Sequence, residues 1–203
     1  MKKSLKILLV LILIVAVVVG GYFGYLQLMK KSATETIDKM FIALRIGDEN
    51  QIKEFINIED AITDNDEQTE GAEMERIMMK NLNYEILSLD CKVNQCTANL
   101  KITNKDLNTV FKNYMTKAIS LAFAQAMSDT SDSDIENQLK QYFEEQYDSD
   151  AVENVSKEIT INMKKENGKW NITCDEDALI DAILPGYREF IEYVNSIDSD
   201  LDE

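Results

Sequence analysis

The sequence contains no histidine, one proline, seven glycines and three cysteines among its 203 residues. The lack of histidine removes the commonest general base, proton shuttle and zinc ligand of proteins, so any catalysis would depend on carboxylates, lysine, tyrosine or cysteine. Three cysteines without histidine also make a poor zinc site. Since no stretch carries a catalytic signature, we predict a protein that is not an enzyme and has no catalytic, cofactor-binding or metal-binding residues.

Basic residues are scarce relative to acidic ones, which number 21 and 37 and give a net charge of −16. All the acidic residues follow Lys31, whereas five of the basic residues lie at or before it, so the later part of the chain carries −21. A polyanion of this size repels phosphates and anionic lipid head groups. We therefore exclude nucleic acid as a partner and interpret the acidic excess as a solvated surface.

Charge is absent altogether from residues 7–29, and lysines flank this run on both sides. A helix over these residues, at about 1.5 Å per residue, would cross the roughly 30 Å hydrocarbon layer of a membrane. The run is longer than the apolar core of a cleaved signal peptide, and no cysteine stands at its end to accept a lipid. We therefore predict an uncleaved transmembrane signal-anchor helix at residues 7–29.

This span divides the chain into a cytoplasmic tail at residues 1–6, an extracytoplasmic domain at 33–195 and an acidic tail at 196–203, which we expect to be disordered. The expected location is the cell membrane, with a single pass and the domain outside the cytoplasm. Gly20 and Gly24 form a G-x-x-x-G pattern that can bring two helices together. One interpretation is a homodimer whose helix–helix interface contains these glycines. The other is that they are ordinary glycines of a transmembrane helix without a role in association.

Apolar residues at helical spacing predict helices on both sides of an acidic loop. A capping-box pattern at Ser32–Glu35 predicts a helix that starts just after the span and ends at Gly47. Asp48 and Gln51 favour the cap of a second, short helix. Residues 59–75 have the composition of a surface loop, with Gly71 as a breaker, and Met74, Ile77 and Met78 then suggest a third helix.

Two longer helices are predicted over about residues 105–147. We expect Asn104 to cap the first, which ends near Met127, and the capping box at Ser133–Glu136 to open the second. The acidic run at 128–134 could be a metal site, but it is better explained as the segment that ends the first helix and caps the second. Asp175 is expected to cap a further helix that stops at Pro185, and a last amphipathic piece follows.

Alternating apolar and polar residues predict four strands in two hairpins. The first joins Tyr84–Cys91 to Cys96–Thr103, and the second runs from Val155 to Lys165, turns at Asn167-Gly168, and returns through Trp170. Cys91 and Cys96 have the parity to face each other, so an external location would permit a disulfide that contributes roughly 2 kcal/mol. Cys174 fits a small core residue better than a reactive thiol.

The expected fold is α+β, with helices packed on a curved antiparallel sheet of about four strands. The Phe41–Asp48 segment, the hairpins and the closing Glu166–Ile172 segment resemble the nuclear transport factor 2-like (cystatin-like) fold. The Ile102–Leu107 entry to a long helix resembles uncharacterised membrane-anchored or lipoprotein domains of low-GC Gram-positive bacteria. The resemblance covers about residues 33–184 and implies helices on a curved sheet, sometimes around a pocket, but it carries over no catalytic residue.

These features favour a non-enzymatic binding or interaction module at the cell surface that contacts an unknown protein, peptide or cell-wall ligand. Trp170 and Tyr84 could line a pocket, although strand aromatics more often belong to the core. One alternative is a small-pocket enzyme of the same fold, which requires an inward-facing carboxylate with a raised pKa to act as the base. The other is a dimeric membrane-proximal spacer joined through Gly20 and Gly24.

Overall fold

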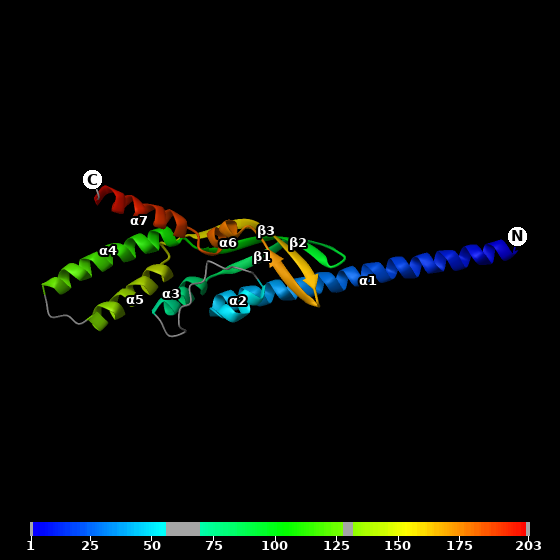
Figure 1. The fold of residues 1–203 in the computed structure, drawn as a ribbon, viewed down its shortest axis with the longest axis horizontal. Helices are drawn as coiled ribbons and strands as arrows, with labels where there is room; N and C mark the ends of the chain where they lie inside the picture. The colour runs from blue at the N-terminus through cyan, green and yellow to red at the C-terminus, as the bar shows by residue number, and fades with distance from the viewer. Residues whose placement is uncertain (1, 56–69, 128–131, 202–203) are drawn as a thin grey trace.

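The computed structural model describes residues 2–55, 70–127 and 132–201, and the side chains of residues 2–15, 49, 70–72, 132–133 and 197–201 lie outside this description. The helices are α1 (Lys2–Ile46), α2 (Glu49–Phe55), α3 (Glu70–Met79), α4 (Leu107–Ala126), α5 (Asp132–Asp148), α6 (Glu176–Ile183) and α7 (Tyr187–Leu201). The strands are β1 (Asn83–Lys92), β2 (Gln95–Lys105), β3 (Asn154–Glu166) and β4 (Lys169–Thr173). The N-terminal rod and the group α4, α5 and α7 project from opposite ends of the sheet (Figure 1).

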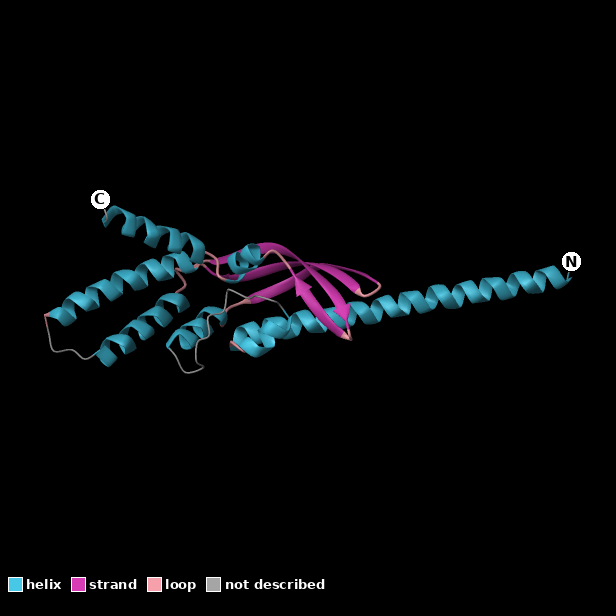
Figure 2. Ribbon diagram, viewed as in Figure 1, coloured by secondary structure: helices cyan, strands magenta, loops and turns pink. Residues whose placement is uncertain are grey.

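The four strands form one antiparallel sheet in the order β1-β2-β3-β4, which confirms the predicted α+β class and strand number (Figure 2). Both predicted hairpins are present. At the β3–β4 turn Asn167 and Gly168 have φ angles of 51° and 85°, the left-handed backbone that the Asn-Gly pair adopts readily. In the β2–β3 register Leu100 opposes Ile159 and Ala98 opposes Ile161, so the predicted apolar positions share one face.

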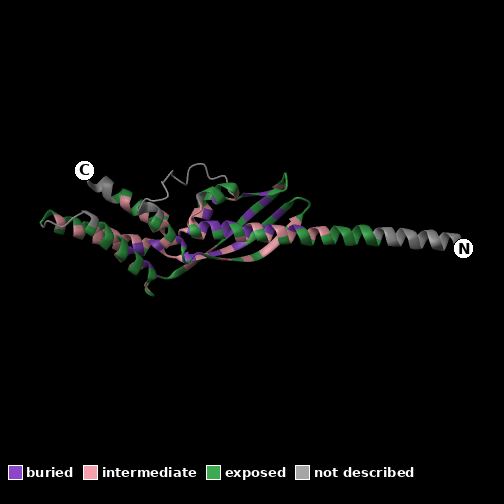
Figure 3. Cartoon of the chain, turned by 90° about the horizontal axis from the view of Figure 1, so that it is seen from below, coloured by how far each residue is buried: buried purple, intermediate pink, exposed green. Residues whose placement is uncertain are grey.

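The larger of the two cores lies on that face, between the sheet and the helices α1 and α6. Figure 3 shows buried residues along the long N-terminal helix where it crosses the strands. Ile37, Met40 and Phe41 of α1 are fully buried there, and Leu179 and Ala182 of α6 are almost completely buried. The opposite face is polar, and its side chains bond to one another across the strands. Examples are Thr97 to Asn162 at 3.0 Å and Thr160 to Asn99 at 2.8 Å. The sheet is therefore a single layer with helices on one side.

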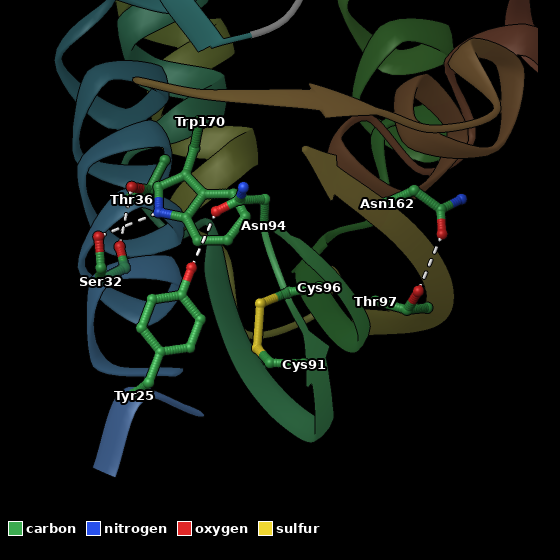
Figure 4. The surroundings of a disulfide bond; sticks show 9 residues. All are labelled: Tyr25, Ser32, Thr36, Cys91, Asn94, Cys96, Thr97, Asn162 and Trp170. Carbon is green, nitrogen blue, oxygen red and sulfur yellow. Dashed lines mark hydrogen bonds between the residues drawn. A yellow bond between two sulfur atoms is a disulfide. The ribbon is translucent and has the colours of Figure 1, made fainter. Parts of the chain in front are cut away.

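The helix α1 is continuous from Lys2 to Ile46, so the prediction that a helix starts at Ser32 is wrong. A capping box satisfies backbone N–H groups that lack partners at a helix start, whereas here the preceding turn already supplies carbonyl partners. The Ser32 hydroxyl instead accepts a hydrogen bond from Nε1 of Trp170 at 3.0 Å (Figure 4). The predicted end is correct, because Gly47 has a φ of 67° and Asp48 accepts the backbone N–H of Gln51 to cap α2.

The rest of the domain contacts α1 before its predicted start at residue 33, and within the predicted span, which ends at residue 29. The hydroxyl of Tyr25 donates to Oδ1 of Asn94 in the β1–β2 turn (Figure 4). Met29 is 6% exposed within the core. Residues 16–24 before this contact are all exposed. Within the described part of the chain, no helix has both the length and the apolar character needed to cross a membrane. The predicted span falls partly on residues whose side chains lie outside the description, and it stays a prediction.

The helix α4 is capped by Asp106 rather than by Asn104, which corrects the sequence prediction. Oδ1 of Asp106 accepts the backbone N–H of Asn108 at 3.0 Å. Asn104 belongs to β2 and its side chain is 0% exposed. Both residue types are good caps, and the pattern does not show that the strand continues for two residues beyond Thr103, to Lys105.

Two further predictions are wrong at helix ends. Residues 73–75 belong to α3 rather than to a loop, and Gly71 lies inside this helix. Glycine in a helix costs only about 1 kcal/mol, which the packing of Met74 and Ile77 on the α4–α5 cluster can outweigh. Residues 196–201, expected to be disordered, continue α7, because each added residue gains a backbone hydrogen bond once a helix exists. Residues 56–69, 128–131 and 202–203 of the predicted acidic segments lie outside the described residues.

Candidate functional site

The helices α4, α5 and α7 form an arm that points away from the N-terminal rod (Figure 1). Leu107 and Val110 of α4, Phe143 and Tyr147 of α5, and Val152 form a second core at the base of this arm. Farther out, α4 has no buried residue. The arm is therefore firmly packed where it leaves the sheet and open toward its tip.

One row of large apolar side chains runs along α4 at intervals of four residues: Phe111, Met115, Ile119, Phe123 and Met127. We call this row the α4 ridge. Its first member stacks on Phe190 of α7 at 4.9 Å between ring centroids and also contacts Tyr187. Exposure then rises toward the tip, from 50% for Ile119 through 71% for Phe123 to 91% for Met127. Residues four apart are each turned by about 40° from the last, so the ridge winds around α4: α7 covers it at its base, and its outer end is uncovered on a neighbouring side of the helix.

The two helices that pack on α4 are acidic in sequence. The helices α5 and α7 have net charges of −5 and −3, since six acidic residues accompany Lys140 and four accompany Arg188. The two lysines of α4 lie over aromatic rings: Lys112 is 4.8 Å from the ring centre of Tyr193, and Lys117 is 5.8 Å from that of Tyr142. An apolar ridge between acidic helices is the arrangement that complements a basic amphipathic helix.

A cavity of about 190 Å³ lies between α3 and α5 beside this arm. Met74, Ile77, Leu139, Tyr114 and Phe143 provide its apolar lining, and Glu73, Glu136, Asn137 and Lys140 its polar lining. Lys140 forms an ion pair with Glu73 across the two helices. The hydrogen bond and charge of Lys140 lower the pKa of Glu73, so this carboxylate is ionised near neutral pH and is a poor general base.

Cys91 and Cys96 lie opposite each other at the end of the first hairpin, and their sulfurs form a disulfide (Figure 4). The adjacent turn contacts α1 through Asn94. Cys174 is a free, half-buried thiol, and burial raises its pKa, which keeps the thiol protonated and weakly reactive near neutral pH.

The two aromatic residues considered as pocket residues belong to the core. Tyr84 stacks on Phe41 at 4.0 Å between ring centroids, and its hydroxyl donates to Asp38. Trp170 is buried, although its edge borders an open hollow of about 520 Å³ between α1, α2 and the β3–β4 turn. Neither ring therefore forms the wall of an enclosed pocket.

The described residues bring together no cluster of three or more acidic or cysteine side chains that could hold a metal ion. The predicted alternative metal site at residues 128–134 lies mostly outside them. The inward positions of the described strands carry no carboxylate, and Asp38, which α1 directs at the sheet, accepts a hydrogen bond from Tyr84. Gly20 and Gly24 have open space around them, where nothing lies within 4 Å of an added Cβ.

The α4 ridge was missed by the sequence reasoning, which assigned α4 one apolar stripe and expected another element to cover it. Phe123, Ile119 and Met127 lie off that stripe. The available signal was that α4 has large apolar residues on more than one side, since a helix that is hydrophobic around its circumference needs a second covering surface.

Comparison with protein-family models, curated proteins and solved structures finds no match to this chain.

Proposed function

We propose that the protein is a non-enzymatic, membrane-anchored binding module outside the cytoplasm, whose α4 ridge docks a basic amphipathic helix of a partner protein. The observation that carries this proposal is the exposure of Ile119, Phe123 and Met127 on the same ridge that α7 covers at Phe111. A ridge of residues four apart is inclined to the helix axis and accepts a helix that crosses it at an angle, so a second helix can pack across the uncovered tip as α7 packs at the base.

The negative charge of this chain determines which kind of partner helix is favoured. The helices beside the ridge are acidic, and the whole chain carries −16, so a second copy of this chain would bring like charges together. A helix with apolar residues on one face and lysine or arginine on the other offers both complementary properties. The partner is therefore a basic helix, and self-association through the ridge is the outcome that would contradict it.

The membrane anchor and the family resemblance belong to the same proposal. The uncharged run at residues 7–29 supports an anchor. Because Tyr25 and Met29 contact the domain, the free part of this run is residues 7–24, about 27 Å of helix. A long helix across one face of an antiparallel meander supports the nuclear transport factor 2-like resemblance.

Full-length protein is expected to stay in the membrane pellet of expressing cells after an alkaline carbonate wash. A variant with Val17→Asp and Val18→Asp places two charges at the middle of the proposed span, each costing about 3 kcal/mol in the bilayer. We expect this variant to shift to the supernatant, measured by immunoblotting of the two fractions. Release of the unmodified protein by the wash would contradict the anchor.

Phe123→Asp is expected to weaken the binding of a basic amphipathic helix about 30-fold, since a central apolar anchor contributes about 2 kcal/mol. The measurement is fluorescence anisotropy of an 18-residue peptide with leucine on one face and lysine on the other, titrated with full-length protein in zwitterionic nanodiscs. Empty nanodiscs give the lipid background. The matched control is Ile42→Asp, which adds the same charge at an exposed apolar position of α1.

Whether Phe123→Asp weakens or strengthens peptide binding distinguishes docking on the ridge from unspecific electrostatic attraction. The substitution makes the protein more acidic, so a purely electrostatic association would strengthen rather than weaken. Equal weakening by Phe123→Asp and Ile42→Asp would argue against the ridge. A peptide with glutamate in place of lysine is expected to bind far more weakly than the basic one.

A further inference from the structure

The helices α3 and α5 lie parallel and are tied together at their C-terminal ends. Nζ of Lys80, just after α3, lies 2.6 Å from Oδ1 of Asp148, and the hydroxyl of Tyr147 donates to the carbonyl of Met78 at 2.7 Å. The cavity of about 190 Å³ lies nearer their N-terminal ends, where Lys140 of α5 pairs with Glu73 of α3. Its lining therefore combines apolar side chains with this ion pair and with the carboxylate of Glu136.

The interior of this cavity matches a small apolar body. Met74 and Ile77 line it from α3, Leu139 and Phe143 from α5, and Tyr114 from α4. An enclosed apolar cavity of about 150 Å³ is large enough to hold benzene. A branched chain of four to five carbons or one aromatic ring therefore fits this volume.

The polar lining of the cavity has an excess of negative charge. Lys140 neutralises Glu73, whereas Glu136, one turn before Lys140 on α5, lines the same cavity and forms no ion pair with any described residue. Glu136, Lys140 and Phe143 share one face of α5, because they are spaced by four and three residues. A group that enters the cavity with its apolar end toward Phe143 therefore leaves its polar end beside the Glu136 carboxylate.

We propose that this cavity binds a primary ammonium group carried on a short apolar body, with Glu136 as the counter-ion and the Glu73–Lys140 pair left intact. Such a group is supplied either by a free aliphatic or aromatic amine or by the amino-terminal residue of a peptide with an apolar side chain. This site is separate from the α4 ridge, so each proposal can fail without the other.

Four probes of one shape test the proposal: 3-methylbutylamine, leucinamide, N-acetyl-leucinamide and 4-methylpentanoate. Binding to full-length protein in zwitterionic nanodiscs is measured by saturation-transfer NMR, with empty nanodiscs as background. We expect at least one of the two amines, 3-methylbutylamine and leucinamide, to bind with a dissociation constant near 1 mM. Ligands of about six to nine heavy atoms, the size of these two compounds, can reach this affinity. Binding of leucinamide identifies a peptide terminus as a source, and binding of 3-methylbutylamine alone identifies a free amine.

The variant Glu136→Gln keeps the shape of the side chain and removes its charge, and it is expected to weaken amine binding about tenfold. Glu145→Gln, an exposed carboxylate of α5 outside the cavity lining, is the matched control and should leave the affinity unchanged. Phe123→Asp should also leave it unchanged. No binding at about 20 mM, equal binding of the uncharged amide, preference for the carboxylate, or indifference to Glu136→Gln would each overturn the proposal.

Discussion

Replacement of Gly186 by alanine is expected to lower the free energy of unfolding by about 4 kcal/mol, a large fraction of the stability of a typical domain. Gly186 has a φ of 85°, which costs a residue with a Cβ about 1–2 kcal/mol. An added Cβ would lie 2.3 Å from Oδ1 of Asp106 and 2.6 Å from the backbone nitrogen of Asn108. Both atoms form the cap of α4, so relief of the clash also disturbs that cap.

Gly168→Ala distinguishes the backbone strain of a positive φ from the steric clash of the added Cβ. Gly168 has the same φ of 85°, but nothing lies within 4 Å of its added Cβ. We therefore expect a loss of about 1 kcal/mol from backbone strain alone. Urea denaturation of both full-length variants, followed by circular dichroism, gives the comparison. Similar losses for the two variants would show that the contact between Gly186 and the start of α4 is unimportant.

Substitution of Asn104 by alanine is expected to lower the free energy of unfolding by about 3 kcal/mol. Its Nδ2 group donates to the carbonyls of Met78 and Ile183 at 2.9 and 2.7 Å. Its Oδ1 atom accepts the backbone N–H of Lys105 at 2.9 Å and lies 2.9 Å from the hydroxyl of Tyr147, which shares its one proton between this oxygen and the carbonyl of Met78. This one amide joins β2 to the ends of α3 and α6 and to α5. Each buried partner left unsatisfied costs about 1–3 kcal/mol.

The matched control is Asn162→Ala, which removes an asparagine of the same sheet from its exposed polar face. A change within about 0.5 kcal/mol is expected there. Leucine at position 104 restores volume but supplies no donors, so we expect Asn104→Leu to be nearly as unstable as Asn104→Ala. Recovery of wild-type stability by the leucine variant would mean that Asn104 acts through packing rather than through its hydrogen bonds.

The burial of Asn104 also shows why some of the fold could not be predicted from the sequence. Local patterns identified the strands, because the alternation around Leu100 and Ile161 depends only on the two-residue period of a strand. The role of Asn104 depends on Met78, Tyr147 and Ile183, which lie 26, 43 and 79 residues away in the chain. Ser32 was misassigned for the same reason, since its partner Trp170 is 138 residues distant.

The candidate site was less predictable than the fold. The sequence suggested that α4 is apolar, but it could not show that α7 ends its coverage near Phe111 and leaves Phe123 exposed. The cavity beside α5 depends on how α3, α4 and α5 pack together, since residues of all three helices line it. Surfaces and gaps between elements are properties of their arrangement, whereas periodicity reports on one element at a time.

The continuity of α1 has a mechanical consequence. From Lys2 to Ile46 one uninterrupted helix joins the proposed anchor to the sheet, and Tyr25, Met29 and Ile37 fasten the domain along it. Because residues 2–46 contain no hinge, any turning of the N-terminal end about its own axis carries the whole domain through the same angle. If residues 7–24 are the proposed anchor, their rotation about the helix axis therefore fixes the direction in which Phe123 faces relative to the membrane.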